Sequence, residues 1–128
     1  MDKTFYITTP IYYPSAKPHM GHAYSSIIAD FLARFKKIDG FDVQFLTGTD
    51  EHGLKIQRSA EKQNIDPLEF CNQISQTFRD LSKTLNLTNT DFIRTTEDRH
   101  KKTVQHLWNE LEKNDDIYLS KYSGWYSV

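Results

Sequence analysis

The chain has 128 residues, of which 16 are lysine or arginine and 17 are aspartate or glutamate, so its net charge at neutral pH is −1. This balance excludes the strong positive field by which a domain attracts nucleic acid or an anionic membrane through charge alone. The single cysteine, Cys71, excludes an internal disulfide and a zinc site with several cysteine ligands, which suits a reducing compartment.

The length suits one domain with a hydrophobic core. A membrane helix needs about 20 apolar residues, and no stretch approaches that length. Residues 1–6 contain no long apolar run and give no sign of a secretory signal, so the predicted location is cytoplasmic. Residues 122–128 resemble a turn entering an aromatic strand, which predicts a fragment cut in mid-fold. The sequence leaves the oligomeric state open.

The first 47 residues predict a strand, a helix and a second strand. Residues 4–9 alternate as a short strand does, and prolines follow them. Residues 20–38 predict an amphipathic helix that ends at Gly40. Residues 41–47 predict the second strand, so the unit is a parallel, right-handed βαβ crossover. The apolar positions of the helix are Ile27, Ile28, Phe31, Leu32 and Phe35.

Further elements follow along the chain. A polar helix is predicted after Gly53, a second begins at a capping Asp66, and residues 91–95 predict a third strand. Cys71 is interpreted as a packing residue. A last helix carries a stripe that we expect to be buried, with Trp108 in the core. That stripe comprises Val104, Leu107, Trp108 and Leu111, and residues 117–119 and 125–128 are expected to start extended segments.

Two loops, at residues 10–22 and 47–53, follow the first two predicted strands. In an open parallel sheet ligands bind beyond the carboxyl ends of the strands, and one crossover brings both loops to the same edge. His19 and His22 lie three positions apart at a helix start, where unpaired N–H groups and the helix dipole favour phosphate. Gly21 leaves room for a nucleotide against the backbone. Two ordinary surface histidines are the alternative interpretation.

Asp50 directly follows the second strand, where a carboxylate could pair with the α-ammonium group of an amino acid. An N-cap aspartate for the helix near Gly53 is the alternative. A ribose-binding acid of a dinucleotide fold is excluded, because no GxGxxG loop precedes it. Ile11 and Tyr13 could line an apolar pocket, although one of the neighbouring tyrosines is expected to pack against other loops instead.

A metal site is the other interpretation of the histidines. Glu51 and His52 could complete such a site together with His19 and His22. Histidines three residues apart without nearby cysteines make a poor zinc set. The sequence therefore predicts no metal site and makes zinc an improbable cofactor.

Three segments together resemble the bacterial-type methionyl-tRNA synthetases, which are class I aminoacyl-tRNA synthetases. They are residues 7–13 (ITTPIYY), 18–24 (PHMGHAY) and 45–53 (FLTGTDEHG). The second segment alone resembles the HIGH signature of all class I synthetases, and its combination with the third is specific for the methionine enzymes. The resemblance spans essentially the whole chain. It implies a truncated α/β, Rossmann-like nucleotide-binding fold, with residues 1–116 in the catalytic domain and 117–128 starting the connective insertion.

The resemblance also implies a reaction and roles for named residues. The family activates methionine with ATP and Mg²⁺ and transfers the methionyl group to tRNA(Met). By matching positions, the catalytic residues would be His19 and His22. ATP would be bound by His19, Gly21, His22 and Tyr13, and methionine by Pro10, Ile11, Tyr13 and Asp50.

The chain departs from the family pattern at several places. Met20 replaces the usual isoleucine, Ser15 stands where many members have asparagine, and Ser127 stands where zinc-bearing members have cysteine. The second signature loop, KMSKS, lies outside the 128 residues, so the segment alone is expected to be inactive. Two other interpretations stay open, a small nucleotidyltransferase of the same superfold and a non-catalytic product of a split gene.

Overall fold

The computed structural model describes residues 3–125. The chain divides into two compact units, residues 1–97 and 98–128, which are described separately. Among the described residues, no helix combines the length and apolar character needed to cross a membrane. The domain boundary expected after residue 116 stays a prediction, and Ser127 lies outside the described part of the chain.

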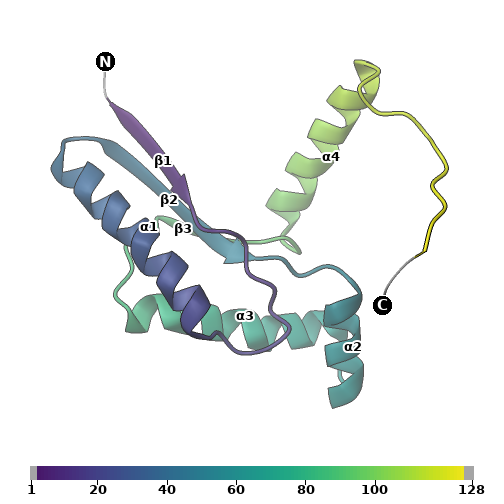
Figure 1. Ribbon diagram of the computed structural model, residues 1–128, viewed down its shortest axis with the longest axis horizontal. Helices are drawn as coiled ribbons and strands as arrows, with labels where there is room; N and C mark the ends of the chain where they lie inside the picture. Colours follow the sequence, from purple (N-terminus) through teal and green to yellow (C-terminus); the bar gives the residue numbers. More distant parts are fainter. Residues whose placement is uncertain (1–2, 126–128) are drawn as a thin grey trace. The chain divides into compact units, whose positions relative to one another are not determined.

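The first unit is built on a parallel sheet of three strands in the order β1-β2-β3 (Figure 1). The strands are β1 (Thr4–Thr8), β2 (Asp42–Thr49) and β3 (Asp91–Arg94). β1 lies in register with β2 so that Ile7 pairs with Phe45, and β3 lies on the other side of β2. Helix α1 (Met20–Ile38) connects β1 to β2. The predicted parallel βαβ unit and α/β fold are therefore confirmed.

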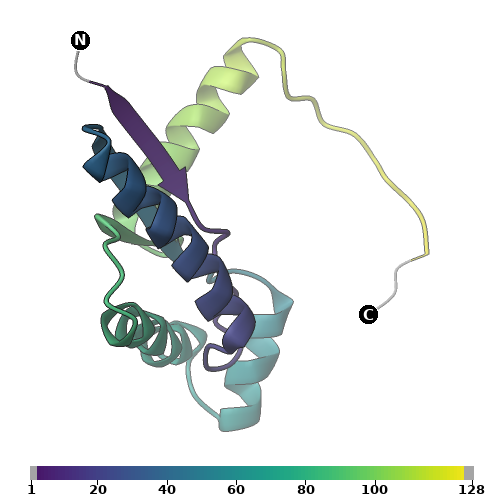
Figure 2. The ribbon, with the colours of Figure 1, turned by 60° about the vertical axis from the view of Figure 1, so that its left-hand side comes forward.

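Helix α1 runs along the sheet (Figure 2) and packs on it through its small residues rather than its large ones. Ala29 and Ala33 contact Phe45 of β2, which is completely buried. The large apolar side chains of the helix are half exposed, with Phe31 at 67% and Phe35 at 54%. The predicted helix is present, but the side that packs on the sheet is the one that carries Ala29 and Ala33. Small side chains let a helix approach a sheet closely.

Two further helices complete the core of this unit. Helix α2 (Leu54–Gln63) packs against α3 (Pro67–Thr84). Asp66 caps α3, since its carboxylate accepts hydrogen bonds from the next turn, as the sequence predicts. Cys71 is 1% exposed and packs between the two helices, which confirms its structural role.

Helices α1 and α3 cover the same face of the sheet. Phe92 of β3, which lies in register with Thr47, packs against Phe78 of α3. Thr47 and Phe45 are two residues apart on β2 and therefore share a face. Tyr6 belongs to the opposite set and is 65% exposed. One face of the sheet is thus covered and the other is open.

The second unit contains helix α4 (Asp98–Lys113). The prediction that its apolar stripe is buried is wrong, because none of the described residues of the helix is buried. Leu107 and Trp108 are 58% and 56% exposed. Residues 116–125 contain no strand, so the extended segment expected at 117–119 forms no sheet, and the one expected at 125–128 lies almost wholly outside the described residues. Among residues 98–125, the described part of this unit, there is no second helix or strand against which the stripe could be buried.

Candidate active site at the carboxyl edge of the sheet

The loop after β1 returns to the end of β2 and is attached to it by backbone hydrogen bonds. The amide of Tyr12 donates to the carbonyl of Gly48 at 3.0 Å, and the amide of Asp50 donates to the carbonyl of Tyr12 at 2.9 Å. Tyr12 and Thr49 form an isolated parallel bridge. Earlier in the loop, the hydroxyl groups of Thr9 and Thr47 lie 2.7 Å apart. The two predicted loops therefore lie side by side at one edge of the sheet.

The two histidines cap the start of α1 together. His19 is the N-cap, and its Nδ1 accepts a hydrogen bond from the amide of Gly21 at 3.0 Å. In return, Nδ1 of His22 accepts from the amide of His19 at 3.1 Å, and the rings stack with centroids 3.9 Å apart. Because both Nδ1 atoms accept, each neutral ring carries its proton on Nε2. Two Nε2–H donors are thus available beside the helix N-terminus.

Tyr12 packs against His22. Its ring lies edge-to-face with the His22 ring, with the ring centroids 4.8 Å apart, and stacks on the Phe78 ring, with the centroids 5.6 Å apart. Its hydroxyl donates to the carbonyl of His22 and lies 3.0 Å from the hydroxyl of Ser26. Partial burial, and next the like charge that a protonated His19 would place beside it, lower the pKa of His22 from its ordinary value of 6.5, which favours the neutral ring.

The histidines share a cavity with the first loop. It has a volume of about 280 Å³ and is lined by Ile11, Tyr12, Tyr13, Ser15, Ala16, Lys17, His19 and His22. Ile11 and Tyr13 therefore lie where the sequence predicts a pocket, and the tyrosine that packs inward is Tyr12, at 7% exposure. Pro10 is exposed and Gly21 is exposed, and neither lines this cavity.

Asp50 is half buried, and its carboxylate makes no hydrogen bond or ion pair to any other residue from 3 to 125. The N-cap of α2 is Gly53, with φ of 113°, and no side chain caps that helix. The alternative interpretation of Asp50 as an N-cap is therefore wrong. The carboxylate keeps its capacity to accept hydrogen bonds from a ligand, next to the bridge that joins the two loops.

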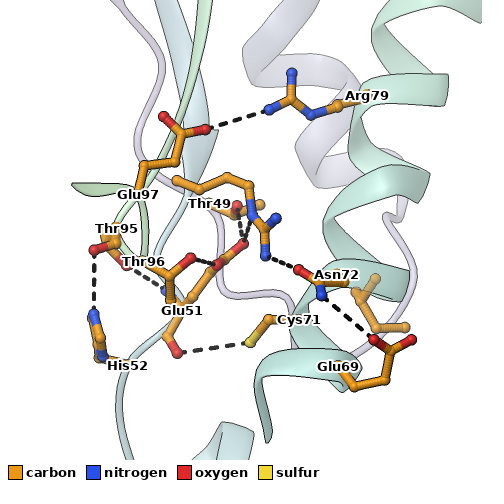
Figure 3. Close-up of polar contacts among 12 residues, drawn as sticks. Thr49, Glu51, His52, Glu69, Cys71, Asn72, Arg79, Thr95, Thr96 and Glu97 are labelled. Carbon is orange, nitrogen blue, oxygen red and sulfur yellow. Dashed lines mark hydrogen bonds and ion pairs between the residues drawn. The ribbon is translucent and has the colours of Figure 1, made fainter. Parts of the chain in front are cut away.

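Glu51 and His52 are already occupied by other partners (Figure 3). The carboxylate of Glu51 accepts from Thr49, Thr96 and Arg94, and Nε2 of His52 lies 3.3 Å from the carbonyl of Thr95. In residues 3–125 no three metal-binding side chains cluster. The structure therefore does not gather Glu51 and His52 into one cluster with His19 and His22.

Sequence reasoning missed two residues of this site. Tyr12 reads as one more aromatic in a proline-bounded loop, and only the bridge to Thr49 reveals that it contacts both the Asp50 loop and His22. The sequence suggests Glu51 only as a possible metal ligand, whereas its side chain is fully buried and bonded within the protein. A signal for Glu51 did exist, because it continues the alternation of Thr47 and Thr49, whose side chains point to the covered face.

Comparison with known proteins identifies the family. Residues 5–128 match the model described as tRNA synthetases class I (M). The chain is 54% identical over 125 residues to methionine–tRNA ligase of Listeria monocytogenes, and 54% identical over 128 residues to that of Rickettsia conorii. These matches cover 98% and 100% of the chain but 19% and 25% of the relatives, so the chain spans at most a quarter of their length.

A solved structure agrees with the sequence matches. The crystal structure of Mycobacterium tuberculosis methionyl-tRNA synthetase bound by methionyl-adenylate superposes with a TM-score of 0.94 at 46% identity. That match covers 98% of this chain and 25% of the other. The fold, the residues that build the edge of the sheet and these relatives agree, and the chain belongs to the methionyl branch of the class I tRNA synthetases.

Proposed function

We propose that the chain supplies the ATP- and methionine-binding edge of a methionine–tRNA ligase, which activates methionine with ATP and passes it to tRNA(Met). The observation that carries the proposal is the position of Tyr12. Its backbone bonds the loop of Asp50, and its side chain contacts His22. An amino acid held by Asp50 and a phosphate held by the histidines would therefore meet at one edge of the sheet.

The two histidines suit ATP because each neutral ring carries its proton on Nε2. Both Nε2–H groups are left to donate, because both Nδ1 atoms accept backbone amides. Donors of this kind, fixed before the ligand arrives, stabilise charge that develops when the α-phosphate is attacked. Gly21 would admit the nucleotide to the backbone between them, and Tyr13 would line the same cavity. Mg²⁺ would accompany ATP as the counter-ion of its phosphates, and zinc has no proposed part here.

Asp50 suits the ammonium group of methionine. Its carboxylate is partly buried and free of protein partners in the described structure. A charge-assisted hydrogen bond to an ammonium group is stronger in such a setting than in open water. Ile11, Tyr13 and Pro10 would offer apolar surface to the methionine side chain. A relative's structure contains methionyl-adenylate, which supports this combination of ligands. Location in the cytoplasm stays a prediction, and the relatives include bacterial enzymes and one named as mitochondrial.

The test uses two variants of a full-length ligase that carries this segment. Asp50→Ala should raise the KM for methionine and leave the KM for ATP unchanged, because it removes the counter-charge of the ammonium group. His22→Ala should slow adenylate formation by about 10²-fold while the KM for methionine stays the same. Methionine-dependent ATP–pyrophosphate exchange measures both. An unchanged methionine KM in Asp50→Ala would contradict the assignment of the methionine pocket.

A further inference from the structure

Glu51 is a buried carboxylate that the proposed reaction does not use. Its side chain has no exposed surface. One oxygen accepts hydrogen bonds from the hydroxyl of Thr49 at 2.9 Å and from Nε of Arg94 at 2.7 Å, and the other accepts from the hydroxyl of Thr96. A fully buried carboxylate is costly unless it is paired and hydrogen-bonded, and this one is both.

The network continues into the neighbouring elements. Arg94 lies in β3, and its Nη2 donates to the amide oxygen of Asn72 in α3 at 2.8 Å. The carbonyl of Glu51 accepts from the thiol of Cys71, also in α3. The amide of Glu51 donates to the hydroxyl of Thr95 at 2.8 Å. Figure 3 shows Thr49 at the end of β2, Cys71 of α3, and Thr95 and Thr96 after β3 lying around Glu51.

This network fixes the residue that precedes Glu51. The amide of Asp50 is bonded to Tyr12 and the next amide is bonded to Thr95, so both peptide groups around Asp50 are anchored. Thr49 and Glu51 contact one another across Asp50 and are both buried. In an extended chain the residue between two such neighbours points to the opposite side. Burial of Glu51 on one side therefore keeps the carboxylate of Asp50 on the other.

The ion pair between Glu51 and Arg94 also helps to hold the loop in place. The guanidinium group of Arg94 is a cation, and Glu51 is its ion-pair partner at 2.7 Å. With that pair intact, the carboxylate of Asp50 is the unpaired charge of the loop. Without the charge of Glu51, the guanidinium group of Arg94 would lose its ion-pair partner inside the network that holds this loop.

We propose that Glu51 is a positioning residue for methionine recognition: with Arg94, Thr49 and Thr96 it holds Asp50 in the geometry that binds the substrate ammonium group. The inference rests on the proposed function of Asp50. Glu51 itself touches no substrate and acts through its neighbour.

The first test is Glu51→Gln in a full-length ligase that carries this segment. The side chain keeps its shape and loses its charge. We expect the KM for methionine to rise about tenfold, with the KM for ATP unchanged. The control is Glu110→Gln, which removes an exposed carboxylate paired with Lys113 on α4 and should change neither constant. Equal increases in both KM values would overturn the inference, because they indicate general damage to the site.

A double variant separates positioning from a purely structural role. In an Asp50→Ala background, Glu51→Gln should change the methionine KM by less than about twofold, since the group through which it acts is absent. An undiminished effect in that background would show that Glu51 does not act through Asp50. If Asp50→Ala alone leaves the methionine KM unchanged, the proposed function fails. If it raises that KM while Glu51→Gln does not, only the present inference fails.

A milder variant keeps the test valid if Glu51→Gln does not fold. Thr96→Val preserves the shape of the side chain and removes one hydrogen bond to the carboxylate. The methionine KM should rise about threefold in a protein whose melting temperature is measured in parallel. A folded Thr96→Val enzyme with an unchanged methionine KM would count against the positioning role.

Discussion

Two glycines beside the site resist substitution for different reasons. A Cβ atom at Gly48 would overlap the carbonyl oxygen of Ile93 and lie 2.7 Å from its Cγ2, so any side chain would force β3 away from β2. A Cβ atom at Gly21 would lie 2.9 Å from Cε1 of His19, which is the end of a side chain that can rotate. A side chain at Gly48 would thus disturb the sheet, whereas a side chain at Gly21 would displace the imidazole of His19.

Replacement of each glycine by alanine should therefore separate stability from activity. Gly48→Ala should lower the free energy of unfolding by about 2 kcal/mol or more, because backbone must move. Gly21→Ala should cost less stability than Gly48→Ala, since the helix propensity of alanine offsets part of the lost His19 cap, and should slow adenylate formation by displacing His19. Thermal melts and pyrophosphate exchange on both variants of the full-length ligase measure this. A destabilised Gly21→Ala protein with normal exchange would reverse the assignment.

At the level of elements, a buried aspartate ties α1 to the segment before β3. Asp30 accepts hydrogen bonds from the amide and the hydroxyl of Thr88, both at 2.6 Å, and from Arg34 at 2.6 Å. Burial acts to raise the pKa of this carboxyl, but the hydrogen bonds and the charge of Arg34 outweigh it and lower the pKa below 3.8. Arg34 also donates to the carbonyl of Asn86, so one ion pair joins the two segments.

This ion pair should make the unit sensitive to acid. Since the folded pKa of Asp30 lies below the ordinary value of 3.8, its stabilisation is complete above that pH and is lost as the pH falls through the folded value. Asp30→Asn should cost about 2 kcal/mol at pH 7, and the difference from the unaltered chain should shrink below about pH 4. Urea unfolding between pH 3 and 7 measures it. Asp39→Asn, which breaks only an exposed contact with Lys36, is the control.

The order and type of elements in the first unit could be predicted from sequence, because periodicity and capping are local properties. The packing faces could not. In α1 the stripe of Ile27, Phe31 and Phe35 is as strongly periodic as a buried face, yet Ala29 and Ala33 contact the sheet. A stripe shows that a helix has an apolar face and not which partner covers it. Trp108 in α4 illustrates the same limit, since its stripe is half exposed.

The site could be predicted further than the packing because its residues follow strand ends. Topology alone brings residues 10–22 and 47–53 to one edge, and the structure places them there. The histidine pair was recognisable from its spacing. The reciprocal cap that fixes both imidazole tautomers was not, because it depends on the position of two Nδ1 atoms. Tyr12 and Glu51 act through partners distant in sequence, which no local pattern encodes.

Considered whole, the first unit is a sheet with helices on one face. Parallel sheets are normally covered on both faces, whereas here Tyr6 on the second face is 65% exposed and α1 presents Phe31 and Phe35 outward. The relatives are about four to five times as long as this chain, since the match covers 19% to 25% of their length. A large apolar surface on this unit is therefore available for contact with other polypeptide.

The 128-residue chain alone should reveal that surface. We expect it to bind the dye anilinonaphthalene sulfonate strongly and to self-associate at high concentration, because neighbouring exposed apolar side chains promote such contacts. It should show no methionine-dependent pyrophosphate exchange, since the KMSKS signature loop of its family is not among its residues. Fluorescence titration, light scattering and the exchange assay test these points. Robust exchange by the purified chain would contradict the last of them.

The backbone bridge between Tyr12 and Thr49 aligns the two loops of the site before any substrate binds. Two hydrogen bonds at 3.0 and 2.9 Å, made by a single residue, join a loop that carries the imidazoles to a loop that carries the carboxylate. The two loops therefore move as one body, and their spacing is established while the protein folds. Substrates that enter such a preorganised site need only lose their own freedom, and the protein need not rearrange to bring them together.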